Sequence, residues 1–119
     1  MALKTKRQLL ERALEALGAL ASGQVAEVED LARVERYLGP TVADLLRRDI
    51  YYIADTEEIE EDIFDDLALC LANTARHAFG LGNDPALPAS VKGPMGAEAS
   101  LRIKGGGGPT YKPLRTTYY

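Results

Sequence analysis

The chain has 119 residues, of which 46% are hydrophobic, so it holds apolar material for one small folded domain. Its single cysteine, Cys70, excludes an intramolecular disulfide and a multi-cysteine zinc site. No stretch approaches the roughly 20 apolar residues that cross a bilayer, and the start of the chain lacks a signal-peptide pattern. We therefore expect a soluble product with no membrane partner.

The net charge of −4 is distributed unevenly along the chain. Residues 24–66 are rich in acid, whereas from Pro85 onward every charged residue except Glu98 is basic. Such a division favours pairing between chains, because the basic end of one copy can lie on the acidic body of another. The alternative is that both parts are simply solvated.

A first helix is predicted from about residue 6 to residue 19. Thr5 and Gln8 have the spacing of a capping box, in which each side chain bonds a free backbone N–H at the helix start. One face of this helix is apolar at three- and four-residue steps, with Leu9, Leu10, Ala13, Leu14, Leu17 and Leu20.

A second helical region is predicted from about residue 25 to residue 48, with a kink or break at Gly39–Pro40. The segment 50–53 is short and apolar, and we interpret it as a connector because no partner strand is evident. A third helix is predicted over about residues 57–79, capped by Asp55 or Thr56 and ended by Gly80.

From Pro85 onward proline and glycine become frequent, including four consecutive glycines at residues 105–108. Glycine brings no side chain to a core and loses the most backbone entropy when ordered. We therefore predict a helical bundle domain over residues 1–84 and an extended, basic C-terminal arm over residues 85–119, with at most one short helix at 96–103. The predicted fold class is all-α, a small bundle of three to four helices with a long extended arm.

The sequence offers little for catalysis. Cys70 and His77 lie two helical turns, about 10 Å, apart, which is too far for a nucleophile–base pair. We therefore predict no enzyme activity, no catalytic residue and no cofactor. A cell-wall hydrolase using the paired carboxylates Glu11 and Glu15 is an alternative, although helix surfaces carry such pairs routinely.

The start of the third predicted helix is strongly acidic. This run lacks the glycine and the alternating oxygen ligands of a calcium loop, so we predict no metal there. If this surface lined a channel, its charge would let DNA slide past without sticking. The residues of this predicted channel or interface surface are Glu57, Glu58, Glu61, Asp62 and Asp65.

The last segment is rich in tyrosine, unlike a typical disordered tail. Tyrosine and arginine are frequent interface anchors, so we predict that the arm orders against a neighbouring chain, the alternative being a flexible linker with a free end. The predicted docking residues are Arg102, Lys104, Tyr111, Lys112, Leu114, Arg115, Tyr118 and Tyr119.

Two stretches resemble the head-to-tail adaptor proteins of short-tailed bacteriophages, also called tail accessory factors or packaged-DNA stabilisation proteins. The first stretch is similar to the opening helix of that family, and the second to its long core helix. The first stretch comprises Lys4–Thr5–Lys6, Leu9–Leu10 and residues 13–18. The second comprises residues 67–72, Arg76 and residues 77–80.

The resemblance implies a virion protein, made in the host cytoplasm, that forms a homo-oligomeric ring of twelve copies beneath the portal protein. The ring would stabilise packaged DNA, seat a downstream tail or nozzle protein, and dock by its C-terminal arms. DNA would pass through its channel without sequence-specific binding. The alternative function is a small helical regulatory or nucleic-acid-binding module that uses Lys4, Lys6, Arg7 and Arg12 together with the Arg-rich tail.

Overall fold

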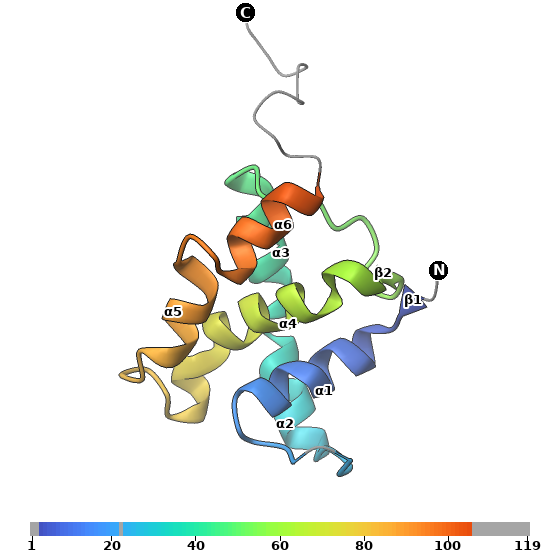
Figure 1. Cartoon of the computed structure of the whole chain (residues 1–119). Coiled ribbons are helices and arrows are strands. Elements are labelled where there is room, and N and C mark those ends of the chain that lie inside the picture. The colour runs from blue at the N-terminus through green and yellow to red at the C-terminus, as the bar shows by residue number, and fades with distance from the viewer. Residues whose placement is uncertain (1–2, 22, 106–119) are drawn as a thin grey trace, which may run out of the picture.

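Helix α4 (Glu61–Ala75) runs through the centre of the computed structural model, which describes residues 3–21 and 23–105. Figure 1 shows the other helices arranged around α4. They are α1 (Lys6–Ala16), α2 (Val28–Glu35), α3 (Leu38–Arg47), α5 (Ala86–Lys92) and α6 (Ala97–Lys104). The described residues are mostly helical, which confirms the all-α prediction in its coarser form, but they contain six α-helices where three to four were predicted.

Helix α1 begins as its sequence predicts. The Gln8 backbone N–H donates to Thr5 Oγ1 at 3.2 Å, and the Thr5 backbone N–H donates to Gln8 Oε1 at 2.9 Å, which completes the capping box. The helix ends at Ala16, earlier than predicted, because Gly18 takes a left-handed conformation with φ 77°. All six predicted apolar positions from Leu9 to Leu20 are buried.

A two-stranded antiparallel sheet was not predicted. Strand β1 (Leu3–Lys4) pairs with β2 (Ile59–Glu60), so that Leu3 lies opposite Glu60 and Lys4 opposite Ile59. These pairs join the start of α1 to the start of α4. Helix α4 therefore begins at Glu61, and the segment from residue 57 precedes the helix rather than forming its first turn. The segment 50–53 forms no strand, as predicted.

The second predicted helix is divided, but not at its proline. Helix α2 ends at Glu35, and α3 starts at Leu38 with Pro40 as its third residue. The first N–H groups of a helix have no partner within the helix, so proline is tolerated there and does not break α3. Pro88 likewise occupies the third residue of α5.

Residues 85–105 pack against the bundle. The sequence predicted an extended arm from residue 85, whereas α5 and α6 both pack on α4 and bury Leu87, Val91, Ala97 and Leu101. The short helix expected at 96–103 is present as α6, and α5 was not expected. The remainder of the predicted arm, residues 106–119, lies outside the described residues.

The far end of α4 tightens into a 3-10 helix, η1 (Arg76–Phe79), which Gly80 ends in a left-handed conformation. One core runs through the described helices and is formed mainly by leucine, isoleucine and alanine. Within residues 3–21 and 23–105, no helix has both the length and the apolar character needed to cross a membrane.

Candidate functional site

The predicted acidic surface is largely paired with the N-terminal segment of the same chain. Its ion pairs are Glu61 with Lys4 at 3.7 Å, Glu57 with Lys6 at 3.6 Å, and Asp65 with Arg12 at 3.1 Å. The side chains of Glu58 and Asp62 have no hydrogen-bond or ion-pair partner among the described residues. The free negative charge of this surface is therefore smaller than the sequence suggests.

The same pairs occupy the basic residues on which a nucleic-acid-binding module would depend. Besides its contact with Glu57, Lys6 binds Glu35 at 3.0 Å, and this hydrogen bond raises the pKa of Lys6. Arg7 pairs with Glu11 at 3.2 Å on α1 itself. Lys4, Lys6, Arg7 and Arg12 thus each lie beside a carboxylate and do not form an uncompensated basic face.

The two predicted docking residues within the described chain lie on α6 and have different surroundings. Lys104 Nζ donates to the Asp62 backbone carbonyl at 2.6 Å and to Asp66 Oδ2 at 3.1 Å, so it holds the end of α6 against α4. Arg102 is exposed, without a hydrogen-bond or ion-pair partner in the part of the chain that the structure describes. The other predicted docking residues, Tyr111, Lys112, Leu114, Arg115, Tyr118 and Tyr119, lie outside the described residues.

A charged cluster that the sequence did not reveal joins α3 to α5 and α6. Arg48 donates to Asp44 at 2.7 Å and to Glu98 at 2.5 Å, and Lys92 donates to Glu98 at 2.9 Å. Asp44 and Arg48 are four residues apart on one helical face, so that pair was predictable. The contact between Arg48 and Glu98 spans 50 residues of sequence and depends on the packing of α6.

The cluster lowers the pKa of both carboxylates. For Asp44, the hydrogen bond from Arg48 is the main cause. For Glu98, partial burial alone would raise the pKa, but the hydrogen bonds from Arg48 and Lys92 outweigh it and the net shift is downward. The cluster is therefore charged at neutral pH and fixes the position of α6.

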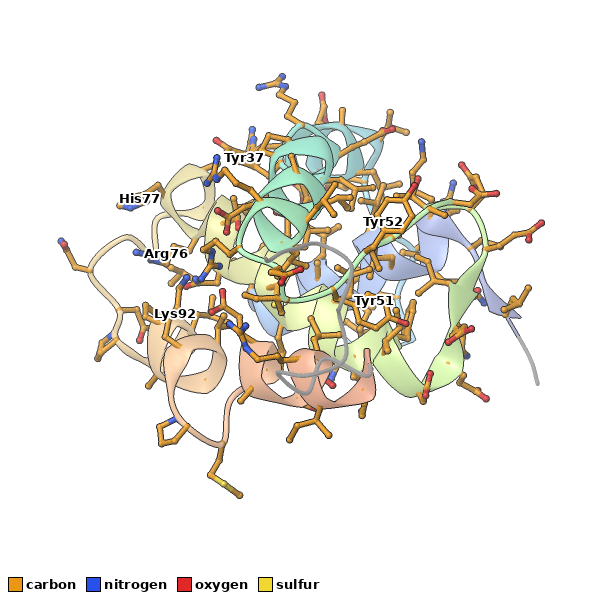
Figure 2. All side chains as sticks on the ribbon, turned by 90° about the horizontal axis from the view of Figure 1, so that it is seen from above. Tyr37, Tyr51, Tyr52, Arg76, His77 and Lys92 are labelled. Carbon is orange, nitrogen blue, oxygen red and sulfur yellow. The ribbon has the colours of Figure 1, made fainter. Side chains whose placement is uncertain are left out.

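Cys70 and His77 form no reactive pair. Cys70 lies on α4 with 3% of its surface exposed, and burial raises the pKa of its thiol to about 12. His77 lies on η1 and is exposed; Figure 2 shows it at the edge of the molecule. The two alternative hydrolase carboxylates, Glu11 and Glu15, are each paired with an arginine. Among the described residues, no group of three metal-ligating side chains is present.

Two adjacent hollows lie on the side of the molecule where α6 ends, each with a volume of about 300 Å³. Tyr51 and Tyr52 line both, and we call the two together the tyrosine groove. Successive residues of an extended segment point to opposite sides, and here Tyr52 is 63% exposed while Tyr51 is half-buried. Figure 2 shows both rings on the face seen from above.

Gly105, at the end of α6, lies on the Tyr51 ring. A Cβ at position 105 would be 2.9 Å from Tyr51 Cδ2, closer than atoms pack, so a larger residue there would have to displace the Tyr51 ring. The adjacent tyrosines are a sequence signal for a partly exposed aromatic surface, but the sequence could not show that the chain passes over them.

The groove, the end of α6 and the acidic residues near the start of α4 thus adjoin in one region of the described chain. Comparisons of the chain with protein-family models, with curated proteins and with solved structures return no match.

Proposed function

We propose that this protein is the head-to-tail connector of a tailed phage. In this proposal twelve copies form a ring beneath the portal protein, stabilise the packaged DNA, and seat a downstream tail or nozzle protein. Each copy docks through residues 106–119, and the protein acts without catalysis or cofactor. The acidic residues that stay unpaired, Glu58 and Asp62, would face passing DNA or a neighbouring copy.

The observation that carries the proposal is the position of the last residues that the structure describes. Lys104 ties α6 to α4, and Gly105 lies on Tyr51, so the last residues that the structure describes have a fixed position on the domain. The residues that follow contain three tyrosines, two prolines and two basic residues. A fixed origin followed by an aromatic, basic segment fits an arm that binds another protein as an extended chain.

A second observation concerns the two segments that resemble the adaptor family. Most of their residues lie in α1, in α4 and in η1, which continues α4, and α1 packs against α4 along the core. The ion pair between Arg12 and Asp65 adds a polar contact between α1 and α4, and the ion pair between Lys4 and Glu61 joins β1 to α4. The resemblance therefore falls on one structural unit rather than on two separate surfaces.

The test is a chain that ends after Gly105. Because the described core lies before that point, we expect unchanged helical content and a melting temperature within about 2 °C of the full chain. We also expect loss of binding to the portal protein of the same phage, measured by co-sedimentation and by electron microscopy of the mixture.

The matched control is the full-length chain with Tyr111, Tyr118 and Tyr119 changed to alanine, which keeps the length and the charge of the segment. We expect this variant to bind the portal more weakly than the unchanged chain. Normal portal binding by the truncated chain would overturn the proposal, and so would salt-sensitive binding to duplex DNA without any binding to the portal.

A further inference from the structure

The tyrosine groove is open and has room for a polypeptide. One hollow is bounded by Leu46, Tyr52 and the end of α6, and the other by Tyr51, Ala54 and Glu58. Leu46 is 51% exposed and Tyr52 63% exposed, so the groove presents apolar and aromatic surface to solvent. Such a surface is stabilised when another chain covers it.

The described chain ends at this groove. Lys104 and Gly105 line the first hollow, and residue 106 follows directly. From Gly105, a segment of five to seven residues spans up to about 17–25 Å when extended. The segment that starts at the edge of the first hollow is therefore long enough to reach the second.

The charges of the groove and of that segment are complementary. The second hollow is lined by Glu58 and Glu60, whose side chains have no hydrogen-bond or ion-pair partner within residues 3–21 and 23–105. Residues 106–119 contain Lys112 and Arg115 and no acid. The same segment supplies proline, leucine and tyrosine side chains for the apolar part of the groove.

We propose that residues 106–119 of the same chain lie in the tyrosine groove of the free protomer, with their basic residues beside Glu58 and Glu60. Attachment at Gly105 favours the same chain over a second copy, because a short tether gives an effective concentration of about millimolar. A partner that binds this segment must then compete with the groove. The proposal concerns the free protomer and does not rest on the connector function.

Disulfide trapping tests this proposal. The variant Ala54→Cys/Thr110→Cys places one thiol in the second hollow and one in the segment, and it keeps every charge. Cys70 remains in place, because it is buried and its thiol pKa is raised to about 12. At micromolar protein and mild oxidation, we expect a monomeric disulfide between positions 54 and 110, identified by mass spectrometry.

The matched control is Ile103→Cys/Thr110→Cys. Ile103 is 77% exposed, lies two residues before Gly105, and lines a different hollow. A segment that is not bound in the tyrosine groove would therefore reach position 103 at least as easily as position 54. We expect the 54–110 disulfide to form about tenfold faster than the 103–110 disulfide, which corresponds to a preference of about 1.4 kcal/mol. Adding Glu58→Lys should remove most of this difference, whereas Glu29→Lys on α2 should not.

Equal rates, or a faster disulfide at position 103, would overturn the proposal. A disulfide that links two chains would also overturn it and would assign the groove to a second copy. Neither result affects the portal-binding test with the truncated chain, so failure of this inference is distinguishable from failure of the connector proposal.

Discussion

Glu98 shows how one side chain can determine the position of a whole helix. Its side chain is 14% exposed and accepts hydrogen bonds from Arg48 and Lys92, which lie on different parts of the chain. Hydrogen bonds to charged groups stabilise more than neutral ones, and an unpaired charge in a half-buried place is unfavourable. Loss of the Glu98 carboxylate would therefore weaken the attachment of α6 and of the groove edge that α6 forms.

We expect Glu98→Gln to lower the free energy of unfolding at neutral pH by about 1–3 kcal/mol, measured by urea denaturation.

The same cluster makes stability depend on pH, because the pKa values of Glu98 and Asp44 are lower in the folded protein than in the unfolded chain. The two carboxylates therefore stabilise the fold above their ordinary pKa values, and this stabilisation is lost as the pH falls through the pKa values that they have in the folded protein. Stability of the unchanged protein should fall as the pH is lowered below the ordinary pKa values of these groups, 4.5 for Glu98 and 3.8 for Asp44, and less steeply in the Glu98→Gln variant. Glu29→Gln, on the surface of α2, is the control. Equal pH dependence in all three proteins would contradict this role of Glu98.

At the scale of single elements, local signals were predictable and boundaries set by packing were not. The capping box of α1 and the ending of the third helical segment at Gly80 follow from residues close together in sequence. The division between α2 and α3 and the existence of α5 depend on contacts with α4. Pro40, at which a break was predicted, lies in the first turn of α3. The charged cluster was missed for the same reason, because Arg48 meets Glu98 only after α6 has packed.

Thr5 is the clearest local test. We expect Thr5→Ala to destabilise the protein by about 1 kcal/mol, because the Gln8 N–H loses its acceptor, and Thr5→Ser to restore most of the loss. Thermal melting followed by circular dichroism measures both. If the alanine variant melts like the unchanged protein, the cap does not limit the stability of α1.

At the scale of the molecule, residues 85–105 differ most from the sequence prediction. Glycines and prolines after residue 85 suggested an arm, but the apolar residues of α5 and α6 complete the core around α4. The sequence could not show this, because each of these helices is too short to be stable alone and forms only by packing. The functional region also depends on this packing, since α6 brings Gly105 to Tyr51.

We expect Leu101→Ala to reduce the free energy of unfolding by about 2–5 kcal/mol in one cooperative transition, because Leu101 is fully buried against the bundle. Ile103→Ala, two residues further on and 77% exposed, should change it by less than about 0.5 kcal/mol. Denaturant unfolding followed by circular dichroism compares the two. If Leu101→Ala and Ile103→Ala both changed the free energy of unfolding only slightly, α6 would not unfold together with the rest of the bundle.

The contact between Gly105 and Tyr51 has a geometric consequence for any symmetric assembly of this protein. Rotational symmetry repeats every local feature of a subunit, so the starting points of the C-terminal segments would form a regular polygon whose size is set by the folded domains. In Figure 1, α6 lies at the opposite end of the molecule from α2. Binding sites on a partner would therefore have to lie within one segment length of the corners of that polygon.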